Sequence, residues 1–419
     1  MPSQHGAHER LGAQYYELHN ESRDGMSRNT TLLEMVQKEG YQSYAFSSNP
    51  LISRRFGFRF DYHYDFAKDP RDEELNSFLR SSEMPDNAGK LEKSILLIKK
   101  HKLGLLSYML YNRTLKKRAA ALLRKKPSQP DKLTRSKRFL KVMRDLKLAE
   151  PFFLFVNLME AHEPYFRGKE KEDAFFCRQF AILTGSDYQS KRLDVRARYG
   201  KHASLSISRL IDLLHVLEPF YQRSIIIVTS DHGQLLGEGS KYGHGTFLDD
   251  ELLKVPLYIR YPSSCEPVLQ RPESFVNLIE IPKIVEYAYN QRNGIHQNGL
   301  RLGSDTCLSE TFGMMSDCSD LAQDENQLQK FRRSYSWRIK LHSVKGSAIY
   351  NYDSASFEEI RGDLNETEAK KMIFETLNQT ASDAPKKESL STLGQAREEV
   401  FTESEIRDLE AKLSTLGYS

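Results

Sequence analysis

Short apolar runs bounded by polar or glycine-rich turns recur along this chain and predict buried β-strands. Three such runs cover residues 41–46, 151–158 and 225–228. The last, Ile-Ile-Ile-Val, is wholly apolar and β-branched, which is typical of a buried strand in a parallel sheet. A fourth run at 255–259 contains Pro256, which places it at a sheet edge or at the start of a strand.

Two segments have helical rather than strand periodicity. Thr31 and Glu34 have the spacing of a capping box, and the short helix that follows is expected to end at Gly40. A longer helix is predicted from Ser204 to Leu217, where apolar residues form one broad face. Because this helix leads directly into the strand at 225, it predicts a strand–helix–strand unit of a parallel sheet.

The pattern changes towards the C-terminus. Residues 336–342 and 347–352 alternate as two antiparallel strands joined by a turn at Lys345 and Gly346. A Ser-, Ala- and Lys-rich stretch follows and predicts a linker. A terminal helix is expected from Thr402 to Leu416.

Composition is that of an ordinary globular protein. The 419 residues are 28% charged and 39% hydrophobic, and 61 basic against 57 acidic residues leave a net charge of +4. This small excess does not argue for nucleic acid as a partner. The four cysteines lack metal-type spacing and are expected to be free thiols, with a Cys307–Cys318 bridge as the alternative.

Membrane-spanning and targeting segments in the sequence would indicate the compartment of the protein. The chain contains no apolar run long enough to span a bilayer and opens with no signal peptide, so it is expected in the cytoplasm if it is complete. Lys and Arg dominate from about 90 to 147, with apolar residues at helical spacing. This basic helical insert is interpreted as a solvated face, with contact to an anionic membrane surface or a polyanionic substrate as the sharper alternative.

Candidate chemistry gathers where the predicted strands end. Asp231 and His232 come directly after the strand at 225–228, and a glycine-rich loop then carries Lys241 and His244. In an open α/β sheet, ligands bind beyond the carboxyl ends of the strands. A carboxylate beside an imidazole is a usual donor mixture for a catalytic divalent metal, although a simple polar turn would show the same residues. His162 follows a second apolar strand, which favours one shared site.

The order S-D-H-G, then K-Y-G-H-G, then K-V-P-L-Y-I-R-Y-P resembles the sulfatase family of the alkaline-phosphatase superfamily. The resemblance implies an α/β three-layer sandwich with a mainly parallel central sheet and a small α+β C-terminal subdomain. On this basis we expect a catalytic domain over 1–295 and a C-terminal subdomain over 296–380. A linker over 381–400 and a terminal helix over 401–419 complete the expected organisation.

The resemblance also implies roles for individual residues. Asp231 and His232 would ligate the metal, and Lys241 and His244 would bind the anion, or His244 a second metal. His162 would protonate or orient the leaving oxygen. Because one ligand is a histidine, zinc or manganese is favoured over calcium or magnesium.

Two further residues are candidates for substrate contact. Asn49 follows the strand at 41–46, and the alternative explanation for it is a turn before Pro50. His5 lies in a P-x-x-H-G segment that resembles one following the nucleophile helix in sulfatases. The family's first strand, with its paired acidic ligands, and its nucleophile have no counterpart in these residues, and no C-x-P-x-R motif occurs. We therefore expect a sulfatase-like catalytic domain that is N-terminally incomplete, and a chain without its nucleophile would be inactive.

The substrate class stays open at this point. The resemblance favours a metal-dependent hydrolase of sulfate esters, acting on a sulfated or phosphorylated small molecule or glycan. True arylsulfatases usually have Asp-Asn at the position of Asp231-His232, whereas Asp-His resembles relatives that hydrolyse phosphonates or phosphodiesters or transfer phospho-groups. Those reactions are the first alternative, and a non-catalytic binding remnant is the second. Oligomeric state is not predicted.

Overall fold

The computed structural model describes a series of ranges rather than the whole chain. They are 31–47, 49, 52, 58–65, 93, 96, 100, 140–145, 148–162, 165, 192–244, 247–267, 269–270, 275–295, 300–311, 324–334 and 336–383. His5, most of the basic insert, residues 384–400 of the expected linker and the expected terminal helix lie outside these ranges.

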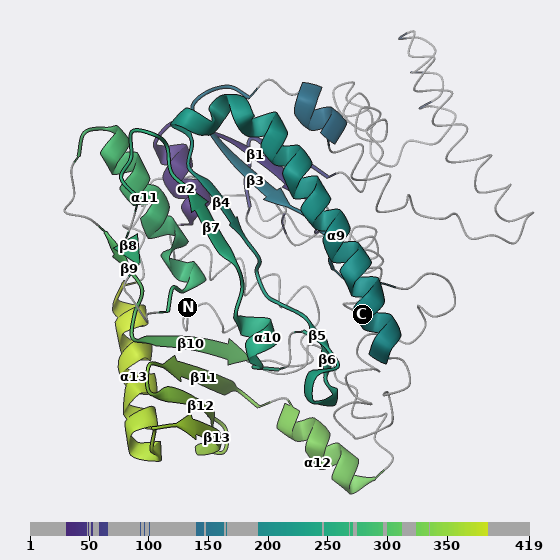
Figure 1. Ribbon diagram of the computed structural model, residues 1–419, viewed down its shortest axis with the longest axis vertical. Coiled ribbons are helices and arrows are strands. Elements are labelled where there is room, and N and C mark those ends of the chain that lie inside the picture. The colour runs from purple at the N-terminus through teal and green to yellow at the C-terminus, as the bar shows by residue number, and fades with distance from the viewer. Residues whose placement is uncertain are drawn as a thin grey trace, which may run out of the picture.

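A parallel three-stranded sheet forms one part of the molecule (Figure 1). Its order is β2 (Tyr62–Tyr64), β1 (Gln42–Ser47), β3 (Phe152–Asn157), with both pairings parallel. The central strand β1 is the most buried because a strand covers each of its edges. Two of the three apolar runs thus form parallel strands, and the predicted α/β class is confirmed.

Helix α2 (Leu32–Lys38) precedes β1 and begins as the sequence predicts. The Thr31 hydroxyl accepts from the Glu34 backbone amide at 3.2 Å, and the Glu34 carboxylate accepts from the Thr31 amide at 2.9 Å. This reciprocal pair is a capping box, which satisfies two amides that have no partner within the helix. The chain then turns through Gly40 at φ 78°, a conformation that favours glycine, and enters β1.

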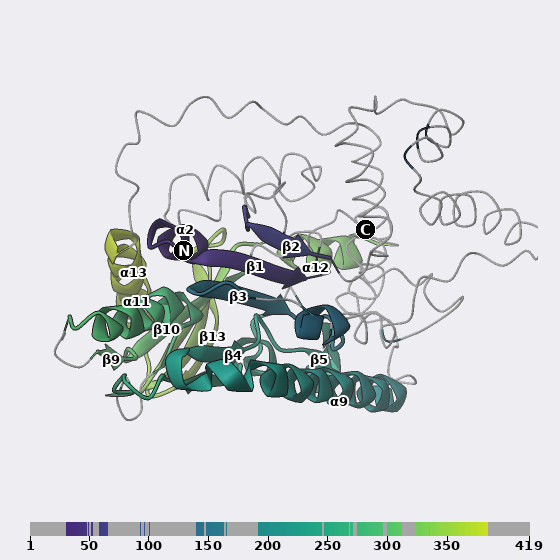
Figure 2. The same cartoon turned by 90° about the horizontal axis from the view of Figure 1, so that it is seen from above.

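Helix α9 (Arg192–Leu217) runs beside the parallel sheet, as Figure 2 shows from above. Its residue Leu213 packs in one core cluster with Tyr44 and Phe46 of β1. The helix begins at Arg192 rather than at the expected Ser204, so the prediction of its start was wrong. The first three turns carry many charged residues, and they extend the helix where apolar periodicity is weak.

The run at 225–228 becomes β4 (Ile226–Thr229), but its pairing differs from the expectation. Strand β4 pairs antiparallel with β7 (Leu257–Arg260), and no described residue of β3 is hydrogen-bonded to β4. The chain returns from β4 to β7 through a loop with no long crossover helix, and such a return gives an antiparallel neighbour. Strand β7 begins one residue after Pro256, as its proline predicts.

Between β4 and β7 the chain forms small elements that shape the candidate site. These are β5 (Leu235–Leu236), η7 (Glu238–Ser240), β6 (Tyr242–Gly243) and α10 (Asp250–Leu253). Strands β5 and β6 pair antiparallel, and Leu235 packs against Phe247 and Leu252 in a small core of its own. The loop therefore has a small hydrophobic cluster of its own.

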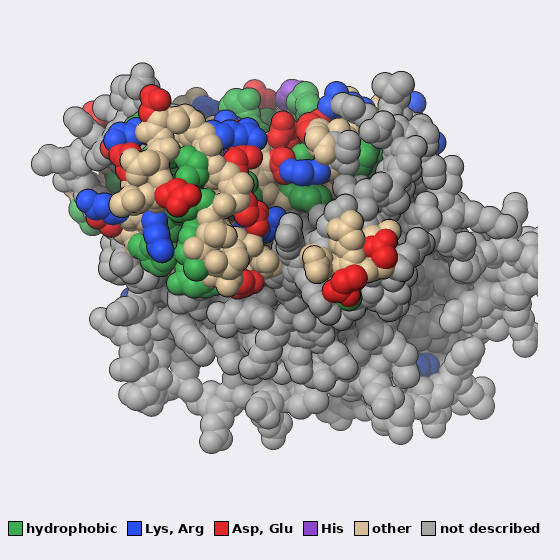
Figure 3. Space-filling view, turned by 90° about the horizontal axis from the view of Figure 1, so that it is seen from below, with side chains coloured by type: hydrophobic (Ala, Val, Ile, Leu, Met, Phe, Trp, Pro, Cys, Tyr) green, Lys and Arg blue, Asp and Glu red, His purple; other side chains and the backbone are tan. Residues whose placement is uncertain are grey.

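A second, antiparallel sheet lies beyond α10 and carries helix α13 (Glu366–Asp383) on one face (Figure 1). Its order is β10 (Thr306–Thr311), β11 (Arg338–Ser343), β12 (Gly346–Asn351), β13 (Ser356–Gly362). The two predicted antiparallel strands are confirmed, and their turn lies one residue earlier than expected, at 344–345. On the face seen in Figure 3, acidic and basic side chains of the described residues are interspersed, in keeping with the small net charge.

The remaining described elements complete the connections. They are η6 (Glu218–Arg223), β8 (Leu269–Gln270), η8 (Leu278–Glu280), α11 (Ile281–Arg292), β9 (Arg301–Leu302) and α12 (Glu325–Ser334). Cys265 and Cys307 are free thiols, as expected for these two residues. Among the described helices, none combines the length and the apolar character needed to cross a membrane.

Candidate active site

Three histidines from separate parts of the chain meet beyond the ends of their strands. His162 follows β3, His232 follows β4, and His244 follows β6. The rings of His232 and His244 are stacked, with centroids 4.2 Å apart and planes 25° apart. The ring of His162 meets that of His244 edge-on at 5.3 Å. The structure thus brings together three residues that lie up to 82 positions apart (162 to 244) in the sequence.

The turn after β4 is set by Gly233. Its backbone amide donates to the Leu252 carbonyl at 2.8 Å, which ties the site loop to α10. A Cβ atom at this position would lie 1.9 Å from the Glu251 carbonyl oxygen. Any side chain would force the two segments apart, so the close approach requires glycine. The Ser230 hydroxyl also donates to the His232 carbonyl at 2.6 Å.

Both histidines of the stacked pair have Nδ1 against an oxygen acceptor. Nδ1 of His232 lies 2.7 Å from the Gly233 carbonyl oxygen. Nδ1 of His244 lies 2.8 Å from Oε1 of Gln234. A carbonyl oxygen only accepts, so each Nδ1 carries a proton, and the neutral form of either ring has its lone pair on Nε2. Metal-binding histidines are usually oriented in this way.

His244 is held in its neutral form. Burial lowers its pKa well below the ordinary value of about 6.5, and the neighbouring His232 and His162 lower it further. A neutral imidazole at physiological pH has the protonation state that metal ligation needs.

Asp231 and His232 face solvent more than His244 does. The Asp231 side chain is 75% exposed, and its Oδ2 lies 3.8 Å from Nε2 of His232. Carboxylate and imidazole suit zinc or manganese. However, no group of three His, Cys, Asp or Glu side chains is arranged around a metal-sized space within the described ranges. The donor types and tautomers fit a metal, and a complete ligand shell is not formed by these residues.

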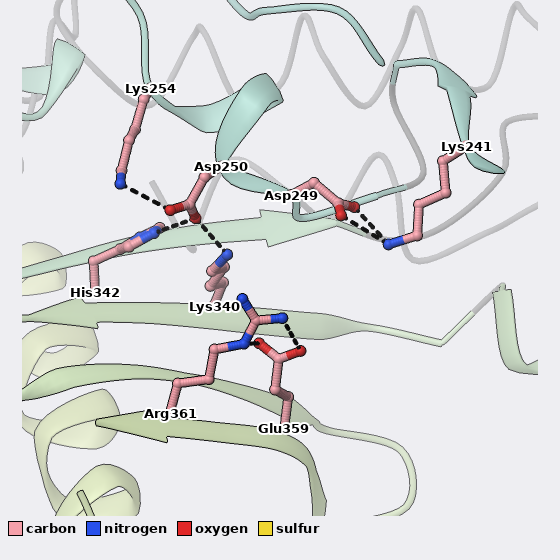
Figure 4. Close-up of polar contacts among 8 residues, drawn as sticks. All are labelled: Lys241, Asp249, Asp250, Lys254, Lys340, His342, Glu359 and Arg361. Carbon is pink, nitrogen blue, oxygen red and sulfur yellow. Dashed lines mark hydrogen bonds and ion pairs between the residues drawn. The ribbon is translucent and has the colours of Figure 1, made fainter. Parts of the chain in front are cut away.

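Lys241 forms a bidentate ion pair. Its Nζ lies 2.8 Å from both carboxylate oxygens of Asp249 (Figure 4). It also lies 5.3 Å from the Phe247 ring centroid. Its side chain is 36% exposed, so solvent reaches the ammonium. Asp249 therefore holds one of the predicted anion-binding residues in a single orientation.

Asn49 lies just past the end of β1. Its backbone amide donates to the Ser47 hydroxyl at 3.0 Å, and that hydroxyl donates to Oδ1 of Asn157, the last residue of β3, at 3.2 Å. Asn49 thus belongs to a polar turn where two parallel strands end. These hydrogen bonds tie it to the strand ends and not to the three histidines.

Three residues of this site were missed by sequence reasoning. Gln234 orients His244, Asp249 holds Lys241, and Asp250 binds the second sheet. Gln234 directly follows the S-D-H-G motif, which was a usable signal. Asp249 is the N-cap and Asp250 the first residue of the short helix α10, where acidic residues are ordinary, so their sequence position pointed only to capping.

The profile of the Sulfatase family matches residues 8–285, which is more than half of the chain. The chain therefore belongs to the sulfatase family, and the family and the α/β sulfatase-like fold expected from the sequence are confirmed. Members of this family typically use a divalent metal.

One curated relative is the low-salt glycan biosynthesis sulfotransferase Agl7 of Haloferax volcanii, 34% identical over 130 residues. The match covers 29% of this chain and 30% of the relative, so the chain spans less than a third of that protein's length.

Two solved structures are similar at lower levels. BT1596, a 2-O GAG sulfatase, has a TM-score of 0.42 and 11% identity, over 84% of this chain and 73% of that one. BT4656, in complex with its substrate D-glucosamine-2-N,6-O-disulfate, has a TM-score of 0.31 and 16% identity, over 45% and 41%.

Proposed function

We propose that this chain acts on sulfate esters of a glycan or small molecule, in a metal-dependent reaction centred on the three histidines. Membership of the sulfatase family supports a hydrolase-type enzyme. The main support for the proposal is that the rings of His162 and His232 both lie against the ring of His244. A shared site explains why three histidines on separate segments meet beyond the ends of their strands.

Asp231 and His232 would provide two ligands of the metal, and His244 would ligate a second metal or bind the anionic ester. Zinc or manganese suits this mixed oxygen and nitrogen set, and when bound it would neutralise charge on the ester's oxygens. The neutral state of His244 supports the role of a metal ligand, because a ligand must offer a lone pair rather than a proton. Gln234 and the Gly233 carbonyl would keep Nε2 of each ring basic and correctly turned.

His162 would exchange a proton with the leaving oxygen. It approaches His244 from β3, on a different strand from the proposed ligands, so it can face the substrate from another side. Lys241 would attract the anionic ester while paired with Asp249. The proposal covers binding, charge neutralisation and leaving-group protonation, and it assigns the nucleophile to none of these residues.

Transfer is the second candidate function. The matching relative is a sulfotransferase of glycan biosynthesis, which favours a sugar hydroxyl as the acceptor in place of water. Phosphodiesters and phosphonates remain alternative substrates because His232 stands where arylsulfatases usually have asparagine. Binding without turnover is the remaining alternative.

Metal content tests the proposal directly. The full chain would be loaded with zinc or manganese, desalted and analysed by inductively coupled plasma mass spectrometry. His232→Ala and His244→Ala are expected to lose bound metal, with affinity falling by about tenfold or more. His215→Ala is the matched control, because His215 is an exposed histidine in the last turn of α9. Equal metal content in all four proteins would overturn the assignment.

Turnover separates the candidate reactions. The same proteins would be assayed with 4-nitrophenyl sulfate and bis(4-nitrophenyl) phosphate, with and without a sugar acceptor. Release that depends on the acceptor would indicate transfer, and preference for the phosphate would replace sulfate as the substrate class. Metal binding without release of either product would indicate the binding remnant.

A further inference from the structure

The site loop ends in two consecutive aspartates that point in different directions (Figure 4). Asp249 binds Lys241 within the loop at 2.8 Å. Asp250 binds the second sheet: its Oδ1 accepts from Nζ of Lys340 at 2.6 Å and lies 2.9 Å from Nε2 of His342. Its Oδ2 lies 2.8 Å from Nζ of Lys254. One dipeptide thus contacts both the proposed anion-binding lysine and a different sheet.

Strand alternation explains why β11 offers these groups. Ile339 and Leu341 point into the core formed with α13 and are fully buried. Successive residues of a strand face opposite sides, so Lys340 and His342 point away from α13 and towards α10. The contact joins residues 90 positions apart in sequence.

The burial of Lys340 makes the ion pair with Asp250 important for stability. Its side chain is only 6% exposed, so the ammonium is removed from water and needs a counter-charge. Burial acts to raise the pKa of Asp250, but hydrogen bonds from Lys254, Lys340 and His342 outweigh it and hold that pKa far below its usual range. The pKa of His342 is lowered by burial, so its neutral ring donates Nε2–H to the carboxylate. Asp250 is therefore ionised at neutral pH.

We propose that Asp249 and Asp250 are positioning residues, through which the second sheet fixes the loop carrying His244 and Lys241. The functional meaning of this inference rests on the proposed function, since the loop matters only if its residues act on a substrate. The ion pairs of the two aspartates go to Lys241, Lys254, Lys340 and His342, so both act on the site through other residues. The link, as we call it, runs from Lys340 through Asp250 and Asp249 to Lys241. Lys340 anchors it on β11, and Lys241 is the side chain that the link positions.

The alternative is that the Asp250–Lys340 pair contributes only to stability. Asp250→Asn removes the charge while keeping the shape, and leaves the Lys340 ammonium buried beside a neutral amide. Lys340→Met removes that unpaired charge while keeping an apolar stem of similar length. The double variant should therefore recover stability, but it still lacks the link.

Hydrogen–deuterium exchange of the full chain separates the two explanations. Asp250→Asn is expected to speed exchange in 235–248 by roughly tenfold while β12 and α13 are unchanged. The double variant with Lys340→Met is expected to unfold near the wild-type denaturant midpoint and to keep the fast loop exchange. Glu359→Gln is the control, because Glu359 pairs with Arg361 at 2.8 Å within β13 and does not reach the loop (Figure 4).

Two results would overturn the inference. Wild-type exchange of 235–248 in Asp250→Asn would mean that the loop does not need the link. A double variant whose loop exchange returns to the wild-type rate together with its stability would mean that the pair only stabilises the fold. Zinc and manganese binding measured on the same proteins keeps the two proposals apart. A wild type that binds neither metal defeats the proposed function, while the exchange data still decide the positioning role.

Discussion

Gly233→Ala and Gly200→Ala make the same chemical change and should have opposite effects on stability. At Gly233, the new Cβ would lie 1.9 Å from the Glu251 carbonyl oxygen and 3.2 Å from the Leu252 Cα atom. These neighbours are backbone atoms that cannot rotate away. The loop must separate from α10, which breaks the 2.8 Å hydrogen bond from the Gly233 amide to the Leu252 carbonyl.

The magnitude follows from these two losses. Forcing extra volume into a closely packed place costs about 1–3 kcal/mol, and a lost backbone hydrogen bond costs about 1 kcal/mol more. We expect Gly233→Ala to lower the free energy of unfolding by about 2–4 kcal/mol. Gly200 lies inside α9, where an added Cβ atom would meet nothing within 4 Å, so Gly200→Ala should raise stability by about 0.8–1 kcal/mol through helix propensity.

Chemical denaturation followed by circular dichroism and tryptophan fluorescence would measure both effects. The chain has one tryptophan, Trp337, beside β11, so the two signals report different parts of the molecule. The reasoning about the loop is refuted if Gly233→Ala unfolds at the wild-type denaturant midpoint. A loss of stability in Gly200→Ala would show instead that any added methyl group is harmful in this fold.

Two further predictions concern the site. The pKa of His244 is lowered by burial in the folded chain. Below about pH 6.5 the unfolded chain therefore binds more protons than the folded chain. The free energy of unfolding of the metal-free protein should decrease as the pH falls through this range. His244→Gln should reduce the difference in the free energy of unfolding between pH 7 and pH 5, as measured by denaturation. An unchanged difference would assign the pH dependence to other groups. Lys241→Met should weaken sulfate binding by about tenfold in calorimetry, because one unit charge is lost from the site. Its effect on unfolding should stay within about 1 kcal/mol, since the Lys241–Asp249 pair is partly exposed; equal sulfate affinity would remove Lys241 from the site.

Local signals in the sequence predicted local structure well. The capping box at Thr31 and Glu34, the strands at β1 and β3, and the hairpin that turns at 344–345 each depend on a few neighbouring residues. Propensity and hydrogen bonding within one turn or one strand are enough to specify such features. The start of α9 was not predicted, because its first turns are charged and have no apolar stripe to reveal them.

The sequence by itself determined which residues are candidates for chemistry, because Asp231, His232 and His244 follow an apolar strand in a polar, glycine-rich loop. Only the tertiary structure decided what each one faces. The stacking of His232 on His244, the antiparallel pairing of β4 with β7 and the contact of Asp250 with Lys340 all join segments that are distant along the chain. Such contacts depend on how whole elements pack, and no local pattern of residues encodes that packing.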